Sequence, residues 1–266
     1  MQTDMTVGRP MKMLLNFTIP VFLGNVFQQL YSMADAVIVG KFVGTKGLAA
    51  VGATGTITFL IIGFLMGLTT GFTVLTSQKF GAGRMDEMRK TVGNAAILSV
   101  VIAAIMTAVS MLGMHRLLVF MHTPEDIFDG AYGYIMIICA GIFTQVLYNL
   151  VSSILRALGN SKTPLYFLIL AAGLNIVLDL VFIIFFHWGA PGAAWATVIS
   201  QGVSGFLCVI YMWKAVPELK MKKEDWQFDR NIAGKQISVG IPMGLQYSIT
   251  AIGGMMVQSS LNILGS

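Results

Sequence analysis

The stretch Gly173-Leu-Asn-Ile-Val-Leu-Asp-Leu-Val-Phe-Ile-Ile-Phe-Phe186 is apolar enough to be the middle of a membrane-spanning helix, yet it carries Asn175 and Asp179. A charged group at membrane depth costs several kcal/mol on most scales, so intramembrane acids usually face a cavity or a partner and mark ion, proton or substrate paths. A second acid, Asp35, lies in the first apolar segment. These acids indicate a membrane protein that binds or moves ions, protons or a substrate within the membrane.

The composition of the whole chain excludes a soluble globular domain. The chain has 266 residues, is 56% hydrophobic and only 11% charged, and has a mean hydropathy of +0.77. We therefore predict an all-α, polytopic membrane protein, because the apolar segments are too long for the short alternating strands of a membrane barrel. Seven segments are long enough to cross a ~30 Å hydrocarbon core, namely 14–40, 48–78, 91–114, 127–155, 164–187, 191–213 and 235–264.

The basic residues predict the orientation of these spans, because loops rich in Lys and Arg stay in the cytoplasm. Only Lys41, Lys46 and Arg116 fall on one side. The other basic residues fall on the opposite side: Arg9, Lys12, Lys79, Arg84, Arg89, Lys90, Arg156, Lys162, Lys214, Lys220, Lys222, Lys223, Arg230 and Lys235. We expect a multi-pass protein of the cell inner (cytoplasmic) membrane with a cytoplasmic N-terminus. Topology then explains the net charge of +5, and we expect no nucleic-acid partner.

The two cysteines, Cys139 and Cys208, both fall within predicted spans. They support neither a disulfide framework nor a metal cluster. The first apolar run is too long for a cleavable signal peptide and lacks a small-residue cleavage site.

A partial internal repeat indicates how the chain is organised. Asn16-Phe-Thr-Ile-Pro20 opens the first span and Ser238-Val-Gly-Ile-Pro242 opens the seventh. Two parallel halves of six spans each are a known transporter plan. We therefore predict a six-helix N-terminal lobe over 1–213, a cytoplasmic inter-lobe connector over 214–234 and the truncated first helix of a C-terminal lobe over 235–266. The whole protein is expected to have roughly 440 residues, twice the distance between the two prolines. The connector also has a simpler interpretation as an ordinary solvated loop.

Three expectations concern packing. The first six spans should share one core, with the seventh lying mainly against empty space. The stripe Gly63-x3-Gly67-x3-Gly71 allows two helices to approach closely. Pro20 should bend the first span, either as a hinge or as a plain kink.

The polar residues at membrane depth can form one site. Asn175 and Asp179 are spaced i, i+4, which places them on one helical face. Thr197 in the sixth span and Asp35 in the first add a hydroxyl and a second carboxyl group. Four oxygen-bearing side chains from three helices suit Na⁺ or a proton, because hard cations prefer oxygen ligands. The alternative is a buried hydrogen-bond network that only holds the helices together.

The chain resembles the multidrug and toxic compound extrusion (MATE) family, in its DNA-damage-inducible (DinF-like) branch. The resemblance covers the N-terminal lobe, the connector and the first helix of the second lobe. It is carried by Ile19-Pro20, Asp35, Gln78-x2-Gly81-Ala-Gly83, Arg156-Ala-Leu-Gly-Asn-Ser-Lys-Thr-Pro164, Asn175-x3-Asp179 and Gly192-Ala-Ala-x-Ala-Thr197. No single motif is decisive, but together, in this order, they are specific.

This resemblance implies a secondary active efflux transporter, not an enzyme, that exchanges H⁺ or Na⁺ for small organic, often cationic compounds by alternating access. The family's cation or proton site would correspond to Asp35, Asn175, Asp179 and Thr197, its central substrate cavity to Gln28, Tyr134 and Asn149, and its bending proline to Pro20. No cofactor is expected beside H⁺ or Na⁺ as the coupling ion, and the lipid bilayer and the missing lobe are the expected partners.

Three other functions compete with this interpretation. A lipid-linked precursor flippase of the same superfamily would line its cavity with basic residues for pyrophosphate, which these spans almost lack. An intramembrane aspartyl protease would need a Gly-x-Gly before one acid, and neither Asp35 nor Asp179 has it. The third alternative is a channel, or a lobe that is retained only as an interaction module.

Overall fold

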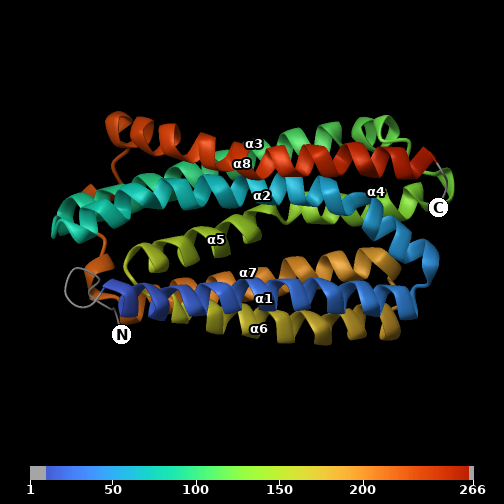
Figure 1. The fold of residues 1–266 in the computed structure, drawn as a ribbon, viewed down its shortest axis with the longest axis horizontal. Helices are drawn as coiled ribbons and strands as arrows, with labels where there is room; N and C mark the ends of the chain where they lie inside the picture. The colour runs from blue at the N-terminus through green and yellow to red at the C-terminus, as the bar shows by residue number, and fades with distance from the viewer. Residues whose placement is uncertain (1–9, 264–266) are drawn as a thin grey trace.

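The structure, a computed structural model, describes residues 10–263, and every regular element in that range is a helix (Figure 1). The predicted all-α fold class is confirmed. Arg9 and residues 264–266, which belong to the predictions above, lie outside the described residues. The helices are α1 (Pro10–Phe42), α2 (Thr45–Gly81), α3 (Met85–Phe120), α4 (Glu125–Ala140), α5 (Ile142–Ala157), α6 (Lys162–Leu180), η1 (Val181–Phe185), α7 (Gly189–Ala215), η2 (Pro217–Leu219), η3 (Lys223–Trp226) and α8 (Arg230–Ile263).

The long helices fall where the sequence predicts spans. Five of them, α1, α2, α3, α6 with η1, and α7, are long and apolar enough to cross a membrane, and the bent pair α4 and α5 makes a sixth if counted as one span. α8 has 34 residues but is not among these candidates. Its crossing of the membrane therefore stays a prediction.

The fourth predicted span, 127–155, is not one uninterrupted helix. The chain bends by 48° between α4 and α5, at Gly141. A Cβ atom at Gly141 would lie 2.2 Å from the nearest side-chain carbon of Val198 in α7. Only glycine allows this approach, and glycine is a common site of helix kinks.

The helices form two groups that α4 and α5 join (Figure 1). α1, α6 and α7 contact one another on one side, and α2, α3 and α8 contact one another on the other. α4 and α5 each pack against both α2 and α7. α1 is the least covered of the candidate spans, since 6% of its most apolar window is buried, against 28 to 50% for the other single helices.

α8 does not lie mainly against empty space, so that expectation is wrong for one of its faces. This face packs along α2 (Figure 1), and the glycine stripe of α2 is the reason. A Cβ atom at Gly71 would lie 2.4 Å from Cα of Gly240, and one at Gly67 would lie 2.6 Å from Cα of Gly244. The stripe therefore does bring two helices together backbone to backbone. The opposite face of α8 is exposed, for example at Ile249.

The connector is shorter than predicted and is fixed to α3. It runs from 216 to 229, because α8 already begins at Arg230. Asp225 is buried and lies 3.5 Å from Nε of Arg89. The side chain of Asn94 donates to the backbone oxygen of Gln227 (3.3 Å) and accepts from the backbone N–H of Asp229 (2.9 Å). This segment is therefore more than a solvated loop, and its role between two lobes stays a prediction.

Candidate cation-binding site

The acids at membrane depth lie together where α1, α6 and α7 meet. Asn175 and Asp179 of α6 are fully buried, and Asp35 of α1 is 8% exposed. The i, i+4 spacing of Asn175 and Asp179 directs both into the bundle. Thr197 of α7, also buried, lies opposite them. The structure therefore brings all four predicted residues into one cluster.

Hydrogen bonds connect the members of the cluster. The hydroxyl of Tyr31 donates to Oγ1 of Thr197 over 3.0 Å. In the orientation that its surroundings favour, the amide of Asn175 donates to Oδ2 of Asp179 (3.1 Å) and accepts from the backbone N–H of Thr197 (3.3 Å). The carboxyl groups of Asp35 and Asp179 lie within hydrogen-bonding range of each other.

Two oxygen atoms of the cluster have no protein partner. Oδ1 of Asp35 and Oδ1 of Asp179 are both buried without a hydrogen bond to any described residue. Buried polar atoms are usually paired, and an exception marks a place where a proton, water or ion belongs. Two adjacent carboxyl groups cannot both keep their charge cheaply, so the pair either shares a proton or holds a cation.

The ligand types fit a hard cation or a proton. Two carboxyl groups, an amide oxygen and a hydroxyl offer oxygen ligands, which Na⁺ prefers over nitrogen or sulfur. Within residues 10–263 no group of three or more His, Cys, Asp or Glu side chains is placed to hold a metal. The acid pair with its amide and hydroxyl neighbours is thus the candidate site among the described residues.

The backbone beside the cluster is irregular. α6 changes to the π-helix η1 two residues after Asp179, and π-turns are frequent at functional sites. Phe182 of this turn stacks on Trp188, with ring centroids 4.9 Å apart. Gly192 of α7 lies against both, because its added Cβ would be 3.2 Å from each of their Cβ atoms. Stacked aromatic rings therefore lie beside the irregular turn that follows Asp179.

Two of the three predicted substrate-cavity residues line one pocket. Gln28 and Asn149 line a pocket of about 70 Å³ together with Pro20. Tyr134 instead lies beside the acid cluster, close enough to Asp35 and Asp179 to be affected by their charges. Pro20 itself lies inside a continuous α1, so its role as a hinge stays a prediction.

Two residues of these sites are absent from the sequence-based prediction. Tyr31 belongs to the acid cluster, and its i, i+4 spacing to Asp35 in the sequence could have identified it. Arg156 was assigned to the cytoplasmic edge by charge alone, but it lines the pocket beside Pro20. Position relative to a span end gives no information on where a long side chain points.

Comparison with known proteins places these features in context. Residues 20–181 match the sequence profile of the family described as MatE. The probable multidrug resistance protein YpnP of Bacillus subtilis (strain 168) is 32% identical over 264 residues, covering 98% of this chain and 58% of that protein. The probable multidrug resistance protein NorM of Thermotoga maritima is 26% identical over 263 residues, covering 96% and 55%.

A solved structure shares the fold. It is described as the outward-facing conformation of a multidrug resistance MATE family transporter of the MOP superfamily. It matches with a TM-score of 0.83 and 28% identity, over 90% of this chain and 53% of that one. The chain thus spans a little more than half the length of the relatives it matches.

Proposed function

The chain belongs to the MatE family, and on this premise we propose that it is part of a secondary active multidrug efflux transporter. The transporter exchanges H⁺ or Na⁺ for organic, often cationic compounds by alternating access between two lobes. Its relatives are multidrug resistance proteins of a multi-pass membrane family, which favours efflux over the flippase alternative. The inner membrane and a cytoplasmic N-terminus are part of the same proposal.

One observation carries this proposal: Asp35 and Asp179 approach each other in a buried cluster, and each has an oxygen that no group of the described residues pairs. A purely structural network would pair these oxygens within the protein. Instead, the unpaired carboxyl oxygens leave the cluster able to bind a proton or a cation. This is what ion coupling at membrane depth requires.

Coupling then rests on mutual exclusion of charge. While the Asp35–Asp179 pair carries negative charge, the lobe favours a cationic substrate. H⁺ or Na⁺ that enters from the outside reduces this charge and weakens that attraction, so the substrate is released. Asn175 holds the carboxyl group of Asp179, the backbone N–H of Thr197 donates to Asn175, and Tyr31 donates to the hydroxyl oxygen of Thr197. The two carboxyl groups titrate as a pair.

The substitution Asp179→Asn tests this role in the protein expressed from its complete reading frame. It keeps the shape of the side chain and removes the titratable charge. We expect ion-driven efflux of ethidium from cells to fall to background while the amount of protein in the membrane stays normal. A buried neutral amide can relieve desolvation, so folding need not suffer.

Asp129→Asn provides a matched comparison, because it removes a carboxyl group at an exposed position of α4 and leaves the acid pair intact. It should keep ion-driven efflux above background. Full ion-driven efflux by Asp35→Asn, Asp179→Asn and the double variant would show that neither acid carries the coupling charge. Poor folding with normal transport per molecule would indicate the structural hydrogen-bond role instead.

A further inference from the structure

Arg156 is a half-buried cation that pairs with no carboxylate among the described residues. Its Nη2 group donates to Oγ of Ser153 over 3.4 Å, which uses one of five guanidinium N–H donors. The ionisable side chains that interact with its charge are Tyr148, Tyr247 and Cys208, which are neutral at neutral pH. A partly buried charge without a counter-ion is unfavourable. This geometry leaves Arg156 ready to bind an anion.

Arg156 lines the pocket of about 70 Å³ between α1, α5 and α6. The side chains of Asn25 and Gln28 line the same pocket, and no Asp or Glu does. Oγ of Ser152, another lining residue, is buried without a hydrogen-bond partner. Gln28 precedes Asp35 by two helical turns, about 10 Å along the helix axis. The pocket is therefore separate from the acid cluster and opposite to it in charge.

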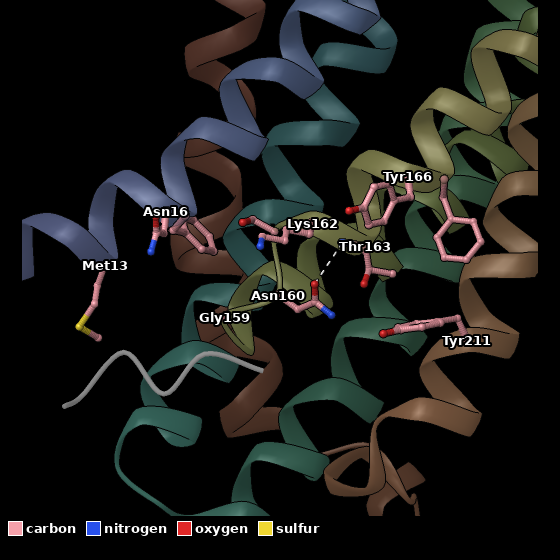
Figure 2. A pocket seen from close by; sticks show the side chains of 11 residues that line it. Met13, Asn16, Gly159, Asn160, Lys162, Thr163, Tyr166 and Tyr211 are labelled. Carbon is pink, nitrogen blue, oxygen red and sulfur yellow. Dashed lines mark hydrogen bonds between the residues drawn. The ribbon is translucent and has the colours of Figure 1, made fainter. Parts of the chain in front are cut away.

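A wider groove of about 570 Å³ adjoins this pocket, and Ser161 lines both. Figure 2 shows the groove between Asn16 of α1, Lys162 at the start of α6 and Tyr211 of α7. Lys162 is exposed and is the only charged residue among those that line the groove in the described chain. The ring of Phe167 meets that of Tyr211 edge to face, with centroids 6.0 Å apart. The groove thus offers aromatic surface beside a second cation.

We propose that the pocket and the groove form one binding site for an organic anion. The carboxylate or phosphate group lies in the small pocket, where Arg156 binds it through two parallel hydrogen bonds. The apolar or aromatic body lies in the groove beside Lys162. Two sources share this chemistry: an anionic phospholipid of the adjacent leaflet and a soluble aromatic phosphate. Binding needs no ion gradient, so the site can exist even if the proposed ion exchange does not.

The test uses the protein from its complete reading frame, purified in an uncharged detergent. Native mass spectrometry counts retained phosphatidylglycerol against phosphatidylcholine, and equilibrium dialysis measures binding of 1-naphthyl phosphate. We expect saturable binding of at least one anionic probe, weakened about tenfold or more by Arg156→Gln, because charge-assisted bidentate bonds are lost. The matched control is Arg116→Gln, at an exposed arginine of α3, which should change affinity by less than about twofold.

Each outcome is decisive. Binding of phosphatidylglycerol alone assigns the site to membrane lipid, and binding of naphthyl phosphate alone assigns it to soluble anions. Binding of neither, or equal affinity in wild type and Arg156→Gln, overturns the proposal. If Arg156→Gln does not fold, Arg156→Lys and Lys162→Gln replace it, and at least one should weaken binding by about threefold or more. Wild-type affinity in both of these variants also overturns the proposal.

Discussion

At the residue scale, the hydroxyl of Tyr31 is the link between α1 and α7 at the acid cluster, through its 3.0 Å bond to Thr197. We predict that Tyr31→Phe destabilises the protein by about 1 kcal/mol, the usual net value of one buried hydrogen bond. Thermal unfolding in detergent measures this effect. Tyr166→Phe is the matched control, because Tyr166 is 65% exposed and should unfold like wild type. Equal unfolding temperatures for Tyr31→Phe and wild type would contradict the link.

The sequence reveals the acid cluster only in part. Asp35 and Asp179 are identifiable because a carboxyl group in an apolar span is rare, and Asn175 because it is one turn from Asp179 on the same face. Tyr31 carries a weaker signal in its i, i+4 spacing to Asp35, because tyrosine occurs in many membrane helices without a site. The place of Arg156 in the pocket is not predicted because the positive-inside rule counts charges near span ends and does not indicate where each side chain points.

At the scale of elements, the glycine stripe of α2 sets the separation from α8. We predict that Gly67→Ala destabilises the protein by about 1–3 kcal/mol, the usual range for overpacking. The added Cβ would lie 2.5 Å from the backbone oxygen of Met243, which cannot move aside as a flexible side chain could. Thermal unfolding again measures the loss.

The same helix supplies the control for this prediction. Gly55 lies in α2 with nothing within 4 Å of an added Cβ, so Gly55→Ala should keep or slightly raise stability, as alanine favours helix over glycine. If Gly67→Ala and Gly55→Ala unfold at the same temperature, the backbone contact between α2 and α8 does not determine their packing.

The sequence predicts where the helices lie better than it predicts which helices pack against each other. Long apolar runs predict the spans, and the stripe at Gly63, Gly67 and Gly71 predicts a close helix–helix contact. The sequence around the stripe does not indicate that α8 makes this contact. The break at Gly141 escapes prediction for the same reason. Its cause, the approach of Val198, lies in another helix far along the chain.

At the scale of the whole molecule, the distribution of Lys and Arg predicts which end of the bundle faces the cytoplasm. The two cysteines of this chain, Cys139 and Cys208, are buried, so they should contribute little to the labelling of a single introduced cysteine. We predict that a membrane-impermeant maleimide labels Lys46→Cys on intact cells, and labels Lys220→Cys only after the cells are made permeable. The reverse pattern would overturn the orientation and the direction of transport drawn from it.

The α2–α8 contact combines glycine backbone with side chains of both helices, since Phe72 of α2 lies against Gly240 and Tyr247 of α8 lies against Gly63. The glycines set a short distance between the axes, and the side chains that lie between the helices resist rotation of one against the other. Any structure attached to the end of α8 is therefore coupled to α2 as to a rigid lever. Such a joint passes a movement of the attached structure directly to the described bundle.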